Sequence, residues 1–454
     1  KNLNDIISKK IIDFSIDKLT KKPFLHDKIE FEIINTCYTI DLNKKKLTYL
    51  NKDEKNNYLK QLKNLTNNII LNQKNYLFKD INKINLLKTK IDHIKKSKLS
   101  HIQKIYYLID SCKNYGTLPF SGIARCAFIS KSILDSLVEK KILSNNEISE
   151  LFLSINTISK KINNDYIYGL KTKNFKNFLN NYGHLRPSTY SISIDNYKDN
   201  FKNYFSNNLN ELSFKKSKKF TFNKKKIKKL DNVFKKNGLK IKFENFINFT
   251  IKSIENREYA KLIFSKSINE IFQNLKKLAR EIKIDYKDFE HLDIDLILKS
   301  FSTLEQEKLK KIILHNINSN KKSSIFSKYI KTPDFIKSHT DFDYFYENSN
   351  KENYITEKEI TGEINVFNHK KKFKTFNNKI IIIENADPGY DFIFSYNIKG
   401  LITKYGGANS HMAIRCMELN LPSIIGVGEK NYNQILNSKK IYIDCINKNF
   451  EIII

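Results

Sequence analysis

Residues 400–428 read GLITKYGGANSHMAIRCMELNLPSIIGVG and decide the fold of the C-terminal part of the chain. The apolar run that opens this stretch favours a strand, and Gly406 and Gly407 then permit a tight turn or a close backbone approach. From His411 onward apolar residues recur at helical spacing until Pro422, and another apolar run follows. The pattern predicts a strand, a glycine turn, a helix that begins near His411, and a second strand.

The predicted position of His411 has a chemical consequence. The free N–H groups and the dipole at a helix N-terminus stabilise an anion, and a neutral imidazole is a competent nucleophile near pH 7. The two glycines leave room for a phosphate, and Ser410 precedes the histidine directly. The residues alone leave two interpretations open. His411 either accepts a phosphoryl group and passes it on, or merely caps a helix in an ordinary α/β domain.

The stretch resembles the phosphohistidine domain, also called the swivelling or mobile domain, of the phosphoenolpyruvate-utilising enzymes. That family includes pyruvate phosphate dikinase, phosphoenolpyruvate synthase and rifampicin phosphotransferase. Its pattern is T-x-x-G-G-x-x-S-H-x-A-I followed by E-L-x-x-P-x-x-x-G. The chain matches this pattern, in one register, at Thr403, Gly406, Gly407, Ser410, His411, Ala413, Ile414, Glu418, Leu419, Pro422 and Gly426. The resemblance implies that His411 is the phosphorylated residue and that Gly406, Gly407 and Ser410 bind the phosphate.

Two positions depart from the family pattern. Asn409 stands where the dikinases carry a regulatory threonine, which argues against that form of control here. Met417 stands at the position of a common arginine, while Arg415 lies two positions earlier. Whether Arg415 substitutes for that arginine is open from the sequence.

The composition bounds the class of protein. A chain of 454 residues is long enough for two or three domains, and 40% hydrophobic residues support real cores. The net charge is +33, yet only five of the 81 basic residues are Arg, and the charge is spread along the chain. Spread Lys is typical of a compositionally drifted sequence, so we expect no specific nucleic-acid partner. A polyanion-binding protein is the weakest of the alternatives.

The cysteines and the apolar runs indicate the cellular compartment in which the protein is expected. The five cysteines form no C-x-x-C pair, and their odd number argues against a disulfide framework. No apolar run is long enough to span a membrane, and no signal peptide is recognisable. We therefore expect a cytoplasmic protein without a membrane span.

Shifts in periodicity and glycine content divide the chain into parts, and the predicted fold class is α+β multidomain. A large, mostly helical N-terminal domain is followed by a small α/β phosphohistidine swivel domain. The predicted divisions are a connecting segment with short strands (1–50), a helical acceptor-substrate domain (51–345), a hinge (346–358) within a polar connection, and the phosphohistidine domain (359–454). The short strands are expected at 28–34 and 37–42, and His26 and Asp27 are expected to be structural.

Two glycine- and proline-containing stretches interrupt the helical region. Residues 115–128 predict an irregular loop that leads into a helix, with Arg125 in its first turn. Residues 182–190 predict a polar loop that carries His184 and Arg186. Both stretches resemble segments of the same family, which implies that Arg125, His184 and Arg186 bind substrate. An internal salt bridge for Arg125 and an ordinary polar turn for the second stretch are the structural alternatives.

A long helix is predicted from 246 to 282, and it holds Arg257, Glu258 and Lys261. Arg257 and Lys261 are four residues apart and share a face, which is also what a solvated helix shows. The pattern R-E-x-x-K resembles the acceptor domain of the family, which implies a catalytic role for these three residues. Two cations that clamp a transferring phosphoryl group are the expected electrostatic device.

The chain contains no recognisable glycine-rich nucleotide loop with paired metal-binding carboxylates. The resemblance implies that ATP and Mg²⁺ act through an ATP-grasp domain, either upstream of Lys1 or on a separate chain. The metal site is unknown, and the acceptor is expected to be a small molecule other than pyruvate in a barrel. A phosphotransferase, or a part of one, is the favoured function. A non-catalytic phosphocarrier or regulatory relic is the main alternative.

Overall fold

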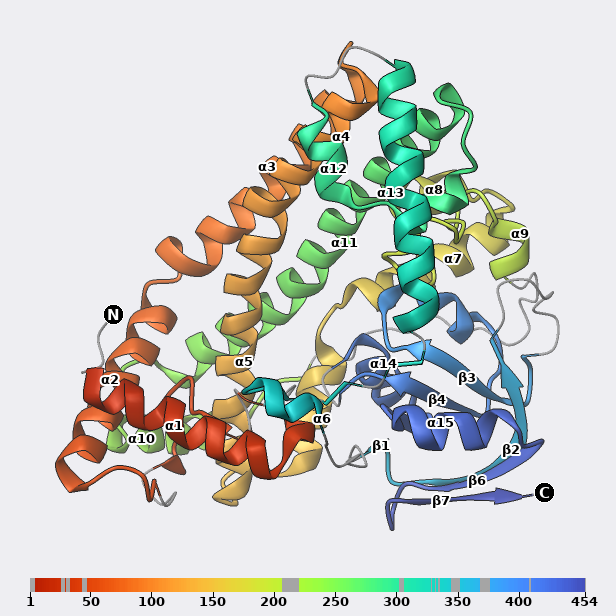
Figure 1. The fold of residues 1–454 in the computed structure, drawn as a ribbon. Coiled ribbons are helices and arrows are strands. Elements are labelled where there is room, and N and C mark those ends of the chain that lie inside the picture. Colours follow the sequence, from red (N-terminus) through yellow and green to blue (C-terminus); the bar gives the residue numbers. More distant parts are fainter. Residues whose placement is uncertain are drawn as a thin grey trace.

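The structure is a computed structural model that describes residues 5–25, 29, 33–42, 47–205, 220–301, 306–327, 329–330, 332–333, 335–343, 352–367, 376–407 and 410–453. A large helical part lies beside a smaller domain built on a twisted sheet (Figure 1). The predicted fold class is confirmed: a mostly helical N-terminal region precedes a small α/β domain.

Helices dominate the chain up to residue 327. They are α1 (Asp5–Lys21), α2 (Lys52–Leu71), α3 (Lys79–Lys96), α4 (His101–Cys112), α5 (Leu118–Glu139), α6 (Asn145–Ser154), α7 (Ile158–Thr172), α8 (Lys176–Tyr182), α9 (Phe201–Tyr204), α10 (Lys224–Lys236), α11 (Phe243–Glu281), α12 (Ile294–Lys299) and α13 (Gln306–Ser327). Side chains cap several of them; Ser144, for example, accepts a hydrogen bond from the Glu147 amide at the start of α6, as its capping-box sequence predicts.

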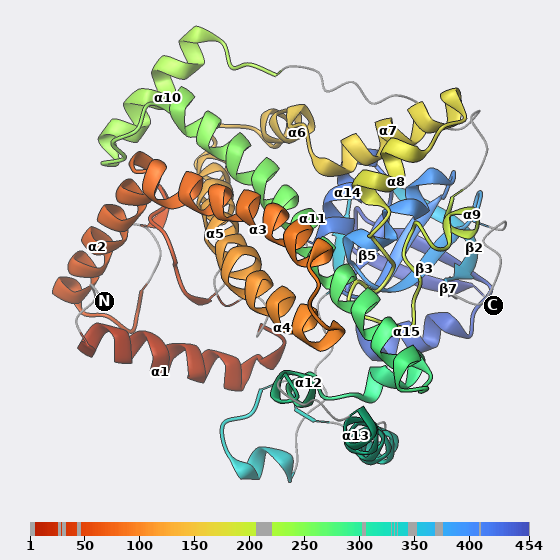
Figure 2. The same ribbon diagram turned by 90° about the horizontal axis from the view of Figure 1, so that it is seen from above.

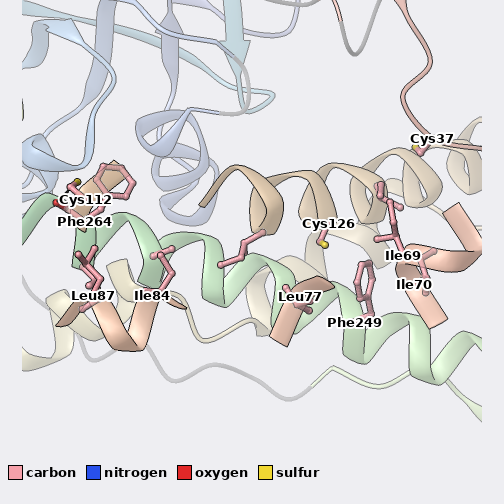
Figure 3. Close-up of a cluster of buried hydrophobic side chains, with 14 of the residues drawn as sticks. Cys37, Ile69, Ile70, Leu77, Ile84, Leu87, Cys112, Cys126, Phe249 and Phe264 are labelled. Atoms are coloured by element: carbon pink, nitrogen blue, oxygen red, sulfur yellow. Dashed lines mark hydrogen bonds between the residues drawn. The ribbon is translucent and has the colours of Figure 1, made fainter. Parts of the chain in front are cut away.

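Helix α11 is the central element of the helical part. It is 39 residues long, and it packs against α3, α4 and α5. Its buried side chains include Phe249 and Phe264, which lie among Leu77, Ile84 and Leu87 (Figure 3). Figure 2 shows α11 running from α10 past the sheet domain. One rigid helix therefore links the main hydrophobic core to the boundary between the two parts of the molecule.

The sheet of the C-terminal domain has seven strands in the order β1-β5-β4-β3-β2-β6-β7. The strands are β1 (Asn353–Ile355), β2 (Glu359–Val366), β3 (Ile380–Asn385), β4 (Gly400–Tyr405), β5 (Ser423–Ile425), β6 (Lys440–Asp444) and β7 (Asn449–Ile453). Strands β2 to β5 are parallel, whereas β1, β6 and β7 pair antiparallel at the edges. Helices α14 (His411–Leu419) and α15 (Gly428–Leu436) complete the domain.

Both faces of the central strands are covered, which explains the continuous isoleucine run of β3. Successive side chains of a strand point to opposite faces. Ile381 and Ile383 accordingly join a core with α14 residues and with aromatic side chains of the helical part. Ile380 and Ile382 join a separate core with α15. The sheet thus holds α14 against the helical part.

The predicted strand–turn–helix–strand unit is present as β4, α14 and β5. The predicted strand at 37–42 is wrong. Tyr38 and Leu42 are fully buried, but the Tyr38 amide donates to the Thr66 hydroxyl at 2.8 Å and the Ile40 amide to the Ser136 hydroxyl at 3.2 Å. Side chains of α2 and α5 therefore satisfy the backbone in place of a strand partner.

Several predictions for the N-terminal segment are not covered by the structure. Most of the strand predicted at 28–34 lies outside the described residues, as do His26 and Asp27. The described part of 1–50 begins with a helix, α1, which precedes both predicted strands.

The predicted irregular loop at 115–128 is also wrong. A π-helical turn (Lys113–Thr117) runs directly into α5, so Arg125 lies in the third turn of a helix and not in its first. The glycines serve packing here: a Cβ at Gly122 would collide with the Asp80 carboxylate. Close approach of α3 and α5, rather than a turn, explains this glycine.

The predicted hinge at 346–358 is partly incorporated into the sheet. Residues 353–355 form β1, which pairs with β5, while 346–351 lie outside the described residues. Among the described helices, none is long and apolar enough to cross a membrane.

Candidate functional site

His411 is the first residue of α14 and follows the glycine turn at the end of β4. Gly406 has φ of 136°, and a Cβ there would lie 2.5 Å from the Cβ of Ala386, so only glycine fits. A Cβ at Gly407 would meet no described atom within 4 Å. The Ser410 hydroxyl accepts a hydrogen bond from the Ala413 amide at 3.3 Å and caps the helix. The turn therefore fixes His411 at a helix N-terminus.

A buried carboxylate holds the imidazole. Nε2 of His411 lies 2.9 Å from Oδ1 of Asp391, and Nε of Arg415 donates to the same oxygen at 3.2 Å. Burial alone would raise the pKa of the Asp391 carboxyl, but His411 and Arg415 outweigh it and hold that pKa below its usual value. Oδ2 of Asp391 is buried without a hydrogen-bond partner among the described residues. Asp391 can thus fix both the orientation and the tautomer of the histidine ring.

Arg415 points inward, with its guanidinium 5.0 Å from the centre of the Phe394 ring, whereas the Met417 side chain is exposed. The side chain of Arg415 therefore does not occupy the place of the residue at position 417, where the family pattern has an arginine. The sequence analysis did not single out Asp391. Its signal was present, because a second carboxylate closely follows Asp387 in an otherwise apolar stretch.

The polar loop after α8 docks on the turn that carries Asp391. The hydroxyls of Ser188 and Tyr390 are 3.1 Å apart, and the Thr189 hydroxyl donates to Asp387 at 3.4 Å. The Tyr197 hydroxyl donates to the Gly389 carbonyl at 2.8 Å, and a Cβ at Gly389 would collide with the backbone of the loop. The loop that the sequence predicted as a ligand site therefore forms an interface between the two parts of the molecule.

This docking closes a small cavity around His411. Its lining combines both parts of the molecule: Ile158, Ile162, Leu185, Thr189, Glu258, Lys261, Leu262, Phe264, Ser265, Pro388, Asp391 and His411. The free volume is only ≈ 40 Å³, about the space of one water molecule. The structure thus brings His411 together with Glu258 and Lys261 of α11 around a cavity that is too small for a nucleotide.

The two α11 residues differ in what they can do. Oε2 of Glu258 accepts a hydrogen bond from the Ile158 amide at 2.8 Å, so this carboxylate caps the start of α7. Burial lowers the pKa of Lys261, and Asp387 partly opposes that effect. Lys261 is therefore a desolvated cation beside His411, whereas Glu258 has a structural role.

Residues 376–448 match the family model described as PEP-utilising enzyme, mobile domain. This part of the chain is a mobile domain of the PEP-utilising type. The match covers β3, β4, β5, β6, α14 and α15, and it confirms the resemblance found in the sequence. It supports a phosphohistidine-carrying phosphotransferase family for the chain. No curated protein sequence matches the chain.

Arg257 and Arg125 lie away from the mobile domain's histidine. Both line a second cleft together with Phe128, and the Arg257 guanidinium is 5.3 Å from the centre of that ring. The predicted pairing of Arg257 with Lys261 at one phosphoryl group is therefore not seen, although the two share a helix. A spacing of four residues places side chains on one face but does not decide which cavity each enters.

His184 and Arg186 are not brought to His411 either. Nε2 of His184 donates to the Leu262 carbonyl at 3.0 Å, and burial lowers the His184 pKa to about 3, which keeps the ring neutral. Arg186 donates to the Ile194 carbonyl at 3.1 Å and to the Asn269 side chain. Both residues anchor the docking loop to α11, which corrects their predicted placement in the acceptor site.

Asp387 is a second carboxyl with an unusual environment. Its Oδ1 accepts a hydrogen bond from the Gly389 amide at 2.8 Å. Burial raises the pKa of Asp387 to about 6, while Gly389 and Lys261 act in the opposite direction. A carboxyl with such a pKa can accept a proton near neutral pH. The mobile domain thus carries a candidate base that the sequence analysis did not single out.

The raised pKa of Asp387 predicts a pH-dependent effect on stability. The folded state favours the protonated form of Asp387. The contribution of this carboxyl to the stability of the fold is therefore full below about pH 4, and it is lost as pH rises through about 6. Asp387→Asn should therefore raise the free energy of unfolding at pH 7.5 by at most about 3 kcal/mol, and with it the melting temperature. At pH 4 it should change both little. Thermal unfolding at both pH values measures this. Glu384→Gln, an exposed change on β3, is the control, and a larger gain at pH 4 would contradict the assignment.

Proposed function

We propose that the chain is a phosphotransferase, or part of one, in which His411 carries a phosphoryl group to a small-molecule acceptor held by the helical part. The observation that carries this proposal is the shared cavity of His411 and Lys261. A histidine at a helix start can accept the group, and a desolvated cation opposite it can stabilise the negative charge of the transferring phosphoryl. The donor is ATP with Mg²⁺, bound by an ATP-grasp domain upstream or on a separate chain.

The proposed reaction has two half-reactions. In the first, a ring nitrogen of His411 attacks the donor's terminal phosphorus, and the bond from phosphorus to the donor oxygen breaks. Asp391 holds the proton on the other ring nitrogen, which keeps the lone pair on the attacking one. In the second, an acceptor hydroxyl attacks phosphorus, the N–P bond breaks, and Asp387 takes the hydroxyl proton. Lys261 faces the phosphoryl oxygens in this step.

The small cavity supports a movement between the half-reactions. With ≈ 40 Å³ of free volume, the docked arrangement has no room for a nucleotide at His411. The mobile domain therefore leaves the helical part to receive the phosphoryl group and returns to deliver it.

The test follows the phosphoryl group. The protein is incubated with ATP, Mg²⁺ and its ATP-grasp partner, and the adduct is identified by its lability in acid and its stability in base. The small-molecule fraction of the cells that make the protein is then added. Loss of the adduct with appearance of a phosphorylated small molecule supports transfer, and an adduct that never discharges contradicts it.

A second candidate is a non-catalytic phosphocarrier or regulatory relic. It is favoured by the structural use of Arg186, Glu258 and His184: of the two predicted α11 residues that line the His411 cavity, Glu258 caps α7 and Lys261 is left as the candidate for catalysis. A carrier would form the adduct but would pass it to a protein and not to a small molecule.

The contact between Asp391 and His411 predicts a slower first half-reaction when the carboxylate is removed. Asp391→Asn alone would remove the carboxylate charge that the buried Arg415 contacts, which destabilises the fold. We therefore compare Arg415→Met with the double variant Asp391→Asn/Arg415→Met. Arg415→Met should keep most of the phosphorylation rate, and the double variant should lose about tenfold or more, because the ring is no longer oriented.

The measurement is the rate of adduct formation in protein whose fold has been checked by circular dichroism. A role of Asp391 in folding alone would slow both variants in proportion to their stability. Equal rates in the two folded variants would show that Asp391 does not position His411.

A further inference from the structure

A second cleft opens between α5, α11 and the segment around Thr36. Its volume is ≈ 460 Å³, far above the ≈ 40 Å³ of the His411 cavity and within the range of small-molecule sites. Its described lining consists of Ile29, Ile34, Thr36, Phe120, Ser121, Ala124, Arg125, Phe128 and Arg257.

The polar side chains among the described lining residues of the cleft can all donate hydrogen bonds. Two guanidinium groups and two hydroxyls line it, and none of its described lining residues is acidic. Arg125 is exposed and Arg257 is half-buried, with its pKa lowered by that burial. The chain has only five arginines, so two in one cleft is a concentration that the general Lys excess does not explain. Two forked cations converging on one space suit a planar or tetrahedral oxyanion.

The remaining walls are apolar. Phe120 and Phe128 face the cleft with Ile34, and the Phe128 ring supports the Arg257 guanidinium from 5.3 Å. A stacked guanidinium is held in one plane, which reduces the entropy lost when it binds an anion. The cleft therefore offers a cationic end and an apolar side to one anionic ligand.

We propose that this cleft binds an amphipathic oxyanion, a small molecule whose carboxylate or phosphate group is attached to an apolar body. If the proposed phosphotransfer holds, this molecule is the acceptor. Helix α11 carries Arg257 into this cleft and Lys261 into the His411 cavity, and the two positions are separated by about 6 Å along the helix. A ligand anchored at Arg257 can therefore extend along α11 toward Lys261, about one helical turn further on.

Binding is tested by titration calorimetry with phenyl phosphate, benzoate and inorganic phosphate, on the wild-type chain and on His411→Ala. Phenyl phosphate or benzoate should bind saturably to both proteins, and inorganic phosphate at least tenfold more weakly, because it has no apolar part. Which of the two aromatic probes binds more tightly identifies the oxyanion. Arg125→Gln should weaken that probe about tenfold or more, since an exposed residue can be changed without harm to the fold.

Arg280→Gln is the matched control, because it removes another exposed helical arginine, on α11, that does not line the cleft. Absence of saturable binding of both aromatic probes overturns the proposal, as does equal weakening in Arg125→Gln and Arg280→Gln. Inorganic phosphate that binds as tightly as the aromatic probes overturns the amphipathic assignment. Because His411→Ala keeps the cleft, a failure here is distinct from a failure to phosphorylate His411.

Discussion

A His411→Ala variant is expected to carry no acid-labile, base-stable phosphoryl group after incubation with ATP, Mg²⁺ and the ATP-grasp partner. The wild-type chain should carry one such group. His411 is the histidine of the mobile domain that lies at a helix start, in contact with Asp391 and beside Lys261. Alanine removes the nucleophile and leaves the Ser410 cap of α14 in place. The expected loss is therefore complete, within detection.

His315→Ala is the matched control, because His315 is exposed on α13 and far from the mobile domain in sequence. It should be phosphorylated like the wild type. The adduct is quantified by intact-protein mass spectrometry under alkaline conditions, and its site is mapped on peptides. An unchanged adduct in His411→Ala would end the assignment, and an adduct that survives acid would indicate a phosphorylated hydroxyl instead.

The sequence predicted the part of the site that is local in the chain. The β4–α14–β5 unit spans fewer than thirty residues, and its glycine turn, Ser410 cap and helix spacing are each determined by near neighbours. Gly406 was required for its conformation, as expected, and the structure adds its close contact with Ala386.

The parts that depend on distant contacts were not predictable in the same way. The role of Glu258 depends on its hydrogen bond with Ile158, a hundred residues earlier. The buried ring of His184 is held by its hydrogen bond to the Leu262 carbonyl. A polar residue in a loop looks the same in sequence whether it binds a ligand or a neighbouring backbone. The Arg257 and Lys261 side chains share a helix face, and only the packing of α5 and of the mobile domain against α11 separates their cavities.

Lys261→Gln is expected to leave the phosphorylation of His411 within about twofold and to slow its discharge about a hundredfold or more. Lys261 contacts the cavity only where the mobile domain is docked, so its charge acts in the second half-reaction and not in the first. Burial lowers the pKa of Lys261, so removal of this desolvated charge should not destabilise the fold. To separate the two half-reactions, His411 is loaded chemically with phosphoramidate, and His411→Ala supplies the background.

Discharge is then followed as loss of phosphohistidine after addition of the small-molecule fraction of the cells. Lys266→Gln is the control, because Lys266 is on the same helix but lines a different cleft. It should discharge at the wild-type rate. Normal discharge in Lys261→Gln would show that the transferring phosphoryl group is stabilised elsewhere. A variant that cannot be phosphorylated at all would show instead that Lys261 acts before docking, in the capture of the group by His411.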